Sequence, residues 1–208
     1  MASVQPDGDE WTRRVLLKCV ASLYDLLGLM VPITITGKIL LQQAWKESGD
    51  WDERMSEKMH EAIAQWWGEI KSLTEVDVAR WLRARPQNSY ALHMFVDASE
   101  VAYGCCIYLL STNQSQLLFA KAREAPLKGH TLARLELQPA FMGSNCLTAV
   151  CAQLRVTVQR IAAWTDGLTV LHWLQRPAYH WKTWVANRVA AIKEIGNKHN
   201  IEWKHCQE

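Results

Sequence analysis

The stretch Phe95-Val96-Asp97-Ala98-Ser99 ends an apolar run that begins at Ala91. A second apolar run, residues 102–110, follows after a few small residues, so the pattern predicts two short strands joined by a tight turn. A carboxylate at the end of a buried strand is costly unless a metal ion or a hydrogen bond compensates its charge. Asp97 is therefore a candidate functional acid. The alternative is that Asp97 only turns the chain, since Asp-Ala-Ser is good turn chemistry.

Two more acids occur in comparable settings. Glu136 lies early in a helix that begins at about Leu132, and Asp166 follows a strand over residues 156–164. If the strands that precede Asp97 and Asp166 are neighbours, their ends lie together and the helix can bring Glu136 to them. Three clustered carboxylates repel one another unless a cation lies between them, and their hard oxygen ligands suit Mg²⁺ or Mn²⁺.

Each of these two acids also has a simpler interpretation. Asp166 can be the N-cap of the next helix. Glu136 can be an exposed helical glutamate or an ion-pair partner of Arg134. The spacing of the residues leaves both alternatives open.

Periodicity divides the chain into a helical part and a part in which strands and helices alternate. The fold class is therefore α/β, with a small all-helical segment before a mixed sheet that has flanking helices. We expect a disordered lead over residues 1–10, a helical segment over 11–79 and an α/β domain over 90–208. Helices are predicted at about 11–27, from Thr34 or Thr36 to 45, 56–73, from 132 onward, 168–174 and 181–198, and strands at 91–96, 102–110, 116–121, 156–164 and 201–205.

The composition says more about the cellular compartment of the protein than about its function. The net charge of +2 over 208 residues is too small to predict nucleic-acid binding by itself. The six cysteines form no CxxC pair, so no zinc site is expected. No secretory signal and no apolar run long enough to span a membrane is found. We therefore expect an intracellular protein in a reducing compartment, cytoplasmic or nuclear, with no membrane partner.

From Leu17 to the end, the chain resembles the reverse-transcriptase connection and RNase H-like region of BEL/Pao-type retrotransposons. The matches follow one another in order over nearly the whole chain, which makes the resemblance specific. The matching stretches are Ala21-Ser22-Leu23-Tyr24-Asp25, Lys38-Ile39-Leu40-Leu41-Gln42, Val96-Asp97-Ala98-Ser99-Glu100, Lys121-Ala122-Arg123, Arg134-Leu135-Glu136-Leu137, Trp164-Thr165-Asp166, Val185-Ala186-Asn187-Arg188-Val189 and Trp203-Lys204-His205.

The resemblance implies an RNase H-like mixed five-stranded sheet. Asp97, Glu136 and Asp166 align with the family's first three catalytic acids and metal ligands. The family cleaves the RNA strand of RNA–DNA hybrids with two Mg²⁺ ions, as part of a larger retroelement polyprotein. Basic residues that flank the acids in the sequence are candidate contacts to nucleic acid, or else solvated surface charges: Arg123, Lys128, Arg134, Lys182 and Arg188.

The chain also departs from the family pattern. The family continues into a helix with a fourth catalytic aspartate, whereas this sequence stops at Glu208, so we expect a truncated domain with impaired cleavage. Pro139 stands where the family has a small helix former, and predicts a kink beside Glu136. Gly167 replaces a serine. The alternative function is an inactive retroelement fragment that binds nucleic acid or protein.

Overall fold

The computed structural model describes residues 10–47, 49–73, 89–112, 114–128 and 131–206. The chain divides into two compact units, and each is described by itself. The first, residues 1–26 and 30–80, is helical; the second, residues 27–29 and 81–208, holds the sheet. Most of the expected disordered lead, and most of residues 80–89 between the two expected domains, lie outside the described residues.

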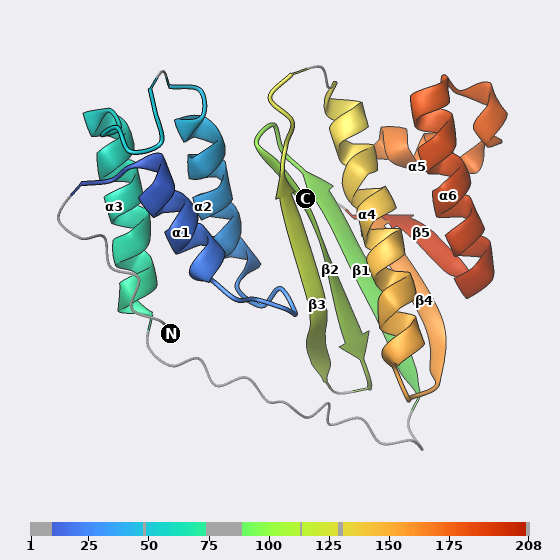
Figure 1. Cartoon of the computed structure of the whole chain (residues 1–208). Coiled ribbons are helices and arrows are strands. Elements are labelled where there is room, and N and C mark those ends of the chain that lie inside the picture. The colour runs from blue at the N-terminus through green and yellow to red at the C-terminus, as the bar shows by residue number, and fades with distance from the viewer. Residues whose placement is uncertain (1–9, 48, 74–88, 113, 129–130, 207–208) are drawn as a thin grey trace. The chain divides into compact units, whose positions relative to one another are not determined.

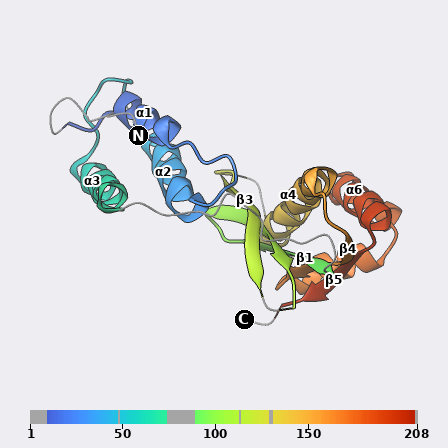
Figure 2. The same cartoon turned by 90° about the horizontal axis from the view of Figure 1, so that it is seen from below.

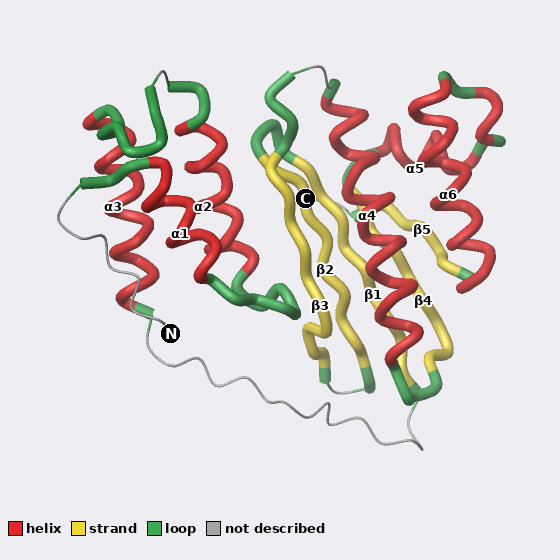
Figure 3. Tube along the Cα trace, in the orientation of Figure 1, coloured by secondary structure: helices red, strands yellow, loops and turns green. Residues whose placement is uncertain are grey.

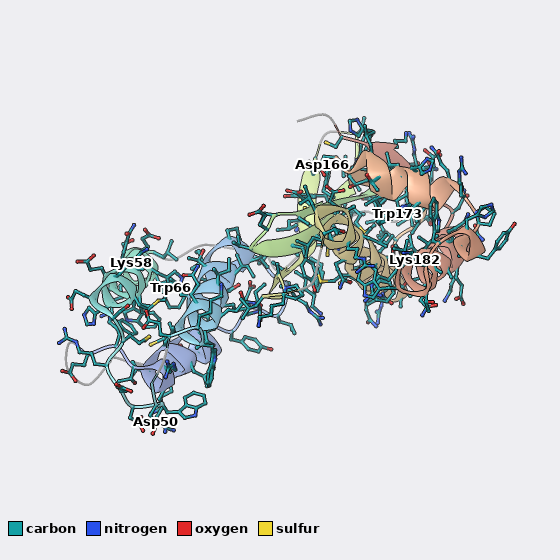
Figure 4. The ribbon with its side chains drawn as sticks, turned by 90° about the horizontal axis from the view of Figure 1, so that it is seen from above. Asp50, Lys58, Trp66, Asp166, Trp173 and Lys182 are labelled. Carbon is teal, nitrogen blue, oxygen red and sulfur yellow. The ribbon has the colours of Figure 1, made fainter. Side chains whose placement is uncertain are left out.

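Three helices pack around a tryptophan-rich core in the first unit. They are α1 (Arg13–Ser22), α2 (Val31–Ala44) and α3 (Glu57–Ser72). Thr12 and Ser56 accept hydrogen bonds from backbone amides and so cap α1 and α3. Trp66 lies between α2 and α3 (Figure 4), where its indole N–H donates to the Ile33 carbonyl over 3.0 Å.

The prediction that Thr34 or Thr36 caps α2 is wrong. The helix begins at Val31, and Pro32 lies in its first turn, where a missing N–H costs nothing. The amide of Met30, the N-cap residue, instead donates to the Asp25 carboxylate over 2.8 Å. No side chain caps the first turn of α2.

The second unit is a mixed five-stranded sheet with strand order β3-β2-β1-β4-β5 (Figures 1 and 3). The first three strands are antiparallel, whereas β1–β4 and β4–β5 are parallel. This arrangement confirms the predicted RNase H-like fold class. The strands are β1 (Tyr90–Ala98), β2 (Ala102–Leu110), β3 (Ser115–Glu124), β4 (Val158–Thr165) and β5 (Ile201–His205).

Helices α4 (Leu132–Gln153) and α6 (Thr183–His199) cover one face of the sheet (Figure 2). Shorter helical segments, α5 (Leu168–Gln175) and the turn Ala178–His180, connect β4 to α6. The helix α4 continues through Pro139 as a single element of 22 residues. It packs tightly against the sheet at Gly143, where a Cβ atom would lie 2.8 Å from the Met94 sulfur.

A short backbone segment, residues 27–29, lies along the outer edge of β3. The Ala120 amide donates to the Leu27 carbonyl over 2.9 Å. Gly28 has φ +76°, and a Cβ atom there would lie 1.8 Å from the Ala120 carbonyl oxygen. Only glycine fits this conformation and this approach.

In the part of the chain that the structure describes, no helix is long and apolar enough to cross a membrane.

Candidate functional site

Asp97 lies at the end of β1, one residue before the strand stops. The turn that follows is held by Ser99, whose hydroxyl accepts from the amides of Val101 and Ala102. Asp97 accepts only from the adjacent Ala98 amide, over 2.6 Å, in the hydrogen bonds found among the described residues. The expectation of a buried carboxylate is wrong, because Asp97 is exposed at the open end of the strand.

Asp166 follows the last residue of β4 and is also exposed (Figure 4). It does not cap the next helix, because the N-cap of α5 is Gly167 and no side chain caps it. Because β1 and β4 are parallel and Phe95 pairs with Trp164, Asp97 and Asp166 leave the sheet at the same end and at the same level.

Glu136 lies in the first turns of α4 and is half-buried against the loop after β4. A Cβ atom on Gly167 would lie 2.7 Å from its Oε2 atom. Burial raises the pKa of Glu136, and the negative charges of Asp166 and Asp97 raise it further. The three predicted acids therefore act on one another electrostatically at one end of the sheet.

The carboxylates approach that end of the sheet from two sides. Val96 lies under α4, near Gly143. Because successive side chains of a strand point to opposite faces, the side chain of Asp97 leaves β1 on the face away from α4. Glu136 approaches from the α4 side. Among the described residues, no three His, Cys, Asp or Glu side chains are grouped tightly enough to hold a metal ion as they stand. The donor chemistry nevertheless fits a hard divalent cation, because mutual repulsion between carboxylates is what such a cation relieves.

The five predicted basic contacts have different environments. Arg123, Lys128 and Lys182 are exposed, on β3, in the loop before α4 and at the N-cap of α6. Arg134 lies over the ring of Trp184, 5.4 Å from its centroid. Arg188 lies 3.6 Å from the same ring and donates to Gln138 Oε1 over 3.1 Å. Burial lowers the pKa of Arg188, which marks it as a structural residue as well as a charge.

The sequence analysis did not identify Lys121 as a site residue, and it did not predict the cavity that Lys121 lines. The cavity has a volume of about 320 Å³ and is lined by Lys121, Arg123 and Arg188 together with residues of β2 and α4. Arg123 pairs with Tyr103, which pairs with Ala98 beside Asp97. The i, i+2 spacing of Lys121 and Arg123 was the available signal, because such residues share one face of a strand. The predicted strand stopped at residue 121, whereas β3 continues to Glu124.

Solved structures with a similar fold come from foamy virus. A protease-reverse transcriptase in complex with an RNA/DNA hybrid has a TM-score of 0.56 at 10% identity, over 98% of this chain and 26% of that one. The dRH form of that protein in complex with double-stranded DNA has a TM-score of 0.53 at 8% identity, over 93% and 34%. This chain therefore spans about a quarter to a third of those proteins. At such identities the likeness shows the fold alone.

No curated protein matches the chain in sequence. The sequence profile described as "Pao retrotransposon-like RNaseH-like domain" matches residues 12–167. That range is well over half of the 208 residues, and it runs from α1 through β4, past all three candidate acids. The chain belongs to the Pao retrotransposon-like RNaseH-like domain family.

Proposed function

We propose that this domain hydrolyses the RNA strand of RNA–DNA hybrids, with Asp97, Glu136 and Asp166 holding Mg²⁺ or Mn²⁺. The observation that carries the proposal is the position of three carboxylates at one end of the sheet, after β1, after β4 and on α4, where burial and then the charges of Asp166 and Asp97 raise the pKa of Glu136. When bound, the divalent ions supply an activated water and stabilise the leaving oxygen of a phosphodiester.

The protein's own residues present the three carboxylates to the cation. Asp97 and Asp166 are exposed, so their side chains can turn toward a cation without unpacking the core. The Glu136 carboxylate lies against Gly167. The amide of Gly167 donates to the Thr165 hydroxyl over 3.1 Å, which fixes the loop that presents Asp166. The rest of a retroelement polyprotein is the natural partner of a domain from this family.

The test is cleavage of an end-labelled RNA–DNA hybrid by the full chain, analysed on a gel with Mg²⁺ and with Mn²⁺. We expect cleavage of the RNA strand only, and loss of at least about a hundredfold in rate for Asp97→Asn, since a carboxylate that holds a catalytic ion is removed. Glu100→Gln is the matched control, because Glu100 is exposed in the turn after β1. Cleavage that survives Asp97→Asn would overturn the proposal.

A second candidate function is nucleic-acid binding without cleavage. It is favoured by the basic residues around the cavity, Lys121 and Arg123 above all, and by the absence of a preformed three-residue metal group among the described residues. Affinity for a hybrid should then fall steeply with salt, and Arg123→Gln and Lys128→Gln should each reduce the slope by about one. A flat salt response would exclude this function.

A further inference from the structure

Two cysteines on neighbouring elements lie close together beside the basic cavity. Cys105 is on β2 and buried, with 6% of its surface exposed, whereas Cys146 is on α4, half-buried, and lines the cavity. The two thiols are close enough for each to shift the pKa of the other. The two backbones are close as well, because a Cβ atom on Gly143, one turn before Cys146, would lie 3.2 Å from the Cys105 Cβ atom.

The surroundings of the pair favour a thiolate on Cys146. The neighbouring Cys105 thiol lowers the pKa of Cys146 to about 7, and the charges of Lys121 and Arg123 contribute to this lowering. The Cys146 sulfur, together with burial, raises the pKa of Cys105. Three other cysteines have a pKa raised by burial: Cys19, Cys106 and Cys151.

We propose that Cys146 is a thiol–disulfide exchange site for anionic low-molecular-weight disulfides, of the class of oxidised glutathione, and that Cys105 is its resolving thiol. The cavity gives a small disulfide access to the Cys146 sulfur. Its cationic lining, Lys121, Arg123 and Arg188, attracts an anionic reagent in preference to a neutral or cationic one. Cys105 is reached only through Cys146, because the sheet and α4 bury it.

The exchange proceeds in two balanced steps. The Cys146 thiolate attacks one sulfur of the small disulfide; the new bond joins Cys146 to that half, and the other half leaves as a thiolate that takes up a proton. The Cys105 thiol then loses its proton and attacks the Cys146 sulfur, which forms the Cys105–Cys146 disulfide and expels the second small thiol. Two cysteines are oxidised, and one small disulfide is reduced to two thiols.

The experiment is incubation of the full, reduced chain with oxidised glutathione at pH 7, followed by intact mass measurement and non-reducing peptide mapping. We expect a transient single glutathione adduct, then a peptide pair linked through Cys105 and Cys146. Cys146 should react about tenfold faster than Cys106 or Cys151, because its larger thiolate fraction outweighs its lower intrinsic nucleophilicity. Cystamine, a cationic disulfide, should lose this preference.

Variants separate the two roles. Cys105→Ser should trap the glutathione adduct on Cys146, and Cys146→Ser should abolish both adduct and cross-link. Cys151→Ser, on the same helix and also half-buried, is the matched control and should change nothing. Lys121→Gln should slow the reaction with glutathione disulfide more than with cystamine. Predominant labelling of another cysteine, or a wild-type peptide map without the Cys105–Cys146 link, would overturn the assignment.

Discussion

Gly167 limits where the Glu136 carboxylate can lie. A Cβ atom there would come within 2.7 Å of Oε2, the movable end of a flexible side chain. Gly167→Ala should therefore cost less than about 1 kcal/mol of stability but displace the carboxylate, and lower the divalent-metal-dependent cleavage rate by about tenfold. Thermal unfolding and the hybrid-cleavage assay measure the two effects. Gly68→Ala, at a position with open space around it, is the control, and equal rates for both variants would contradict this role of Gly167.

The electrostatics of Glu136 predict a pH-dependent effect on stability without metal. Burial and the two aspartates raise its pKa in the folded state, so folding favours the protonated form and stability is lost as pH rises above the usual glutamate range. Glu136→Gln should raise the free energy of unfolding by about 0.5 kcal/mol at pH 7, after solvent screening, and have no effect near pH 3. Thermal melts in chelator measure this. Glu194→Gln, an exposed position of α6, should have no effect at either pH.

At the scale of elements, the outer edge of β3 depends on one glycine. Gly28→Ala places a side chain at φ +76° and against the Ala120 carbonyl, which costs at least about 1–2 kcal/mol. We expect residues 27–29 to leave the edge and the Ala120 amide, which donates to Leu27, to exchange with deuterium much faster. Amides in the middle of β1, which is paired on both sides, should keep their protection. Unchanged exchange at Ala120 would contradict the pairing.

At the scale of the whole molecule, the two units have separate hydrophobic cores. One is centred on residues such as Ile63 and Trp66, and the other on residues such as Leu92 and Val189, all buried. Ile63→Ala should cost about 2–5 kcal/mol and lower only the melting transition of the helical unit, while Leu92→Ala should lower only that of the sheet unit. Calorimetry, together with tryptophan fluorescence, separates the melting transitions of the two units. A single transition displaced as a whole by either variant would show that the units unfold together.

Much of the fold follows from local pattern. Alternation along β1 and β2, helical periodicity and the small residues between elements predicted nearly every helix and strand, because each element buries one face. The predicted start of α2 was wrong because the helix begins at Val31, with Pro32 in its first turn and no side-chain cap. Pro139 lies inside α4, which continues through it as one helix, and the kink expected beside Glu136 stays a prediction.

The sequence by itself determined the three candidate acids, the family resemblance and the α/β class, because these depend on residue identity and spacing. Only the tertiary structure decided which side chains share a space. It placed Asp97 in solvent rather than in the core, set Gly167 against Glu136 and brought Cys105 to Cys146 beneath Lys121. Such contacts join residues of different elements, and their closeness depends on strand register and helix packing, which no local pattern of residues encodes.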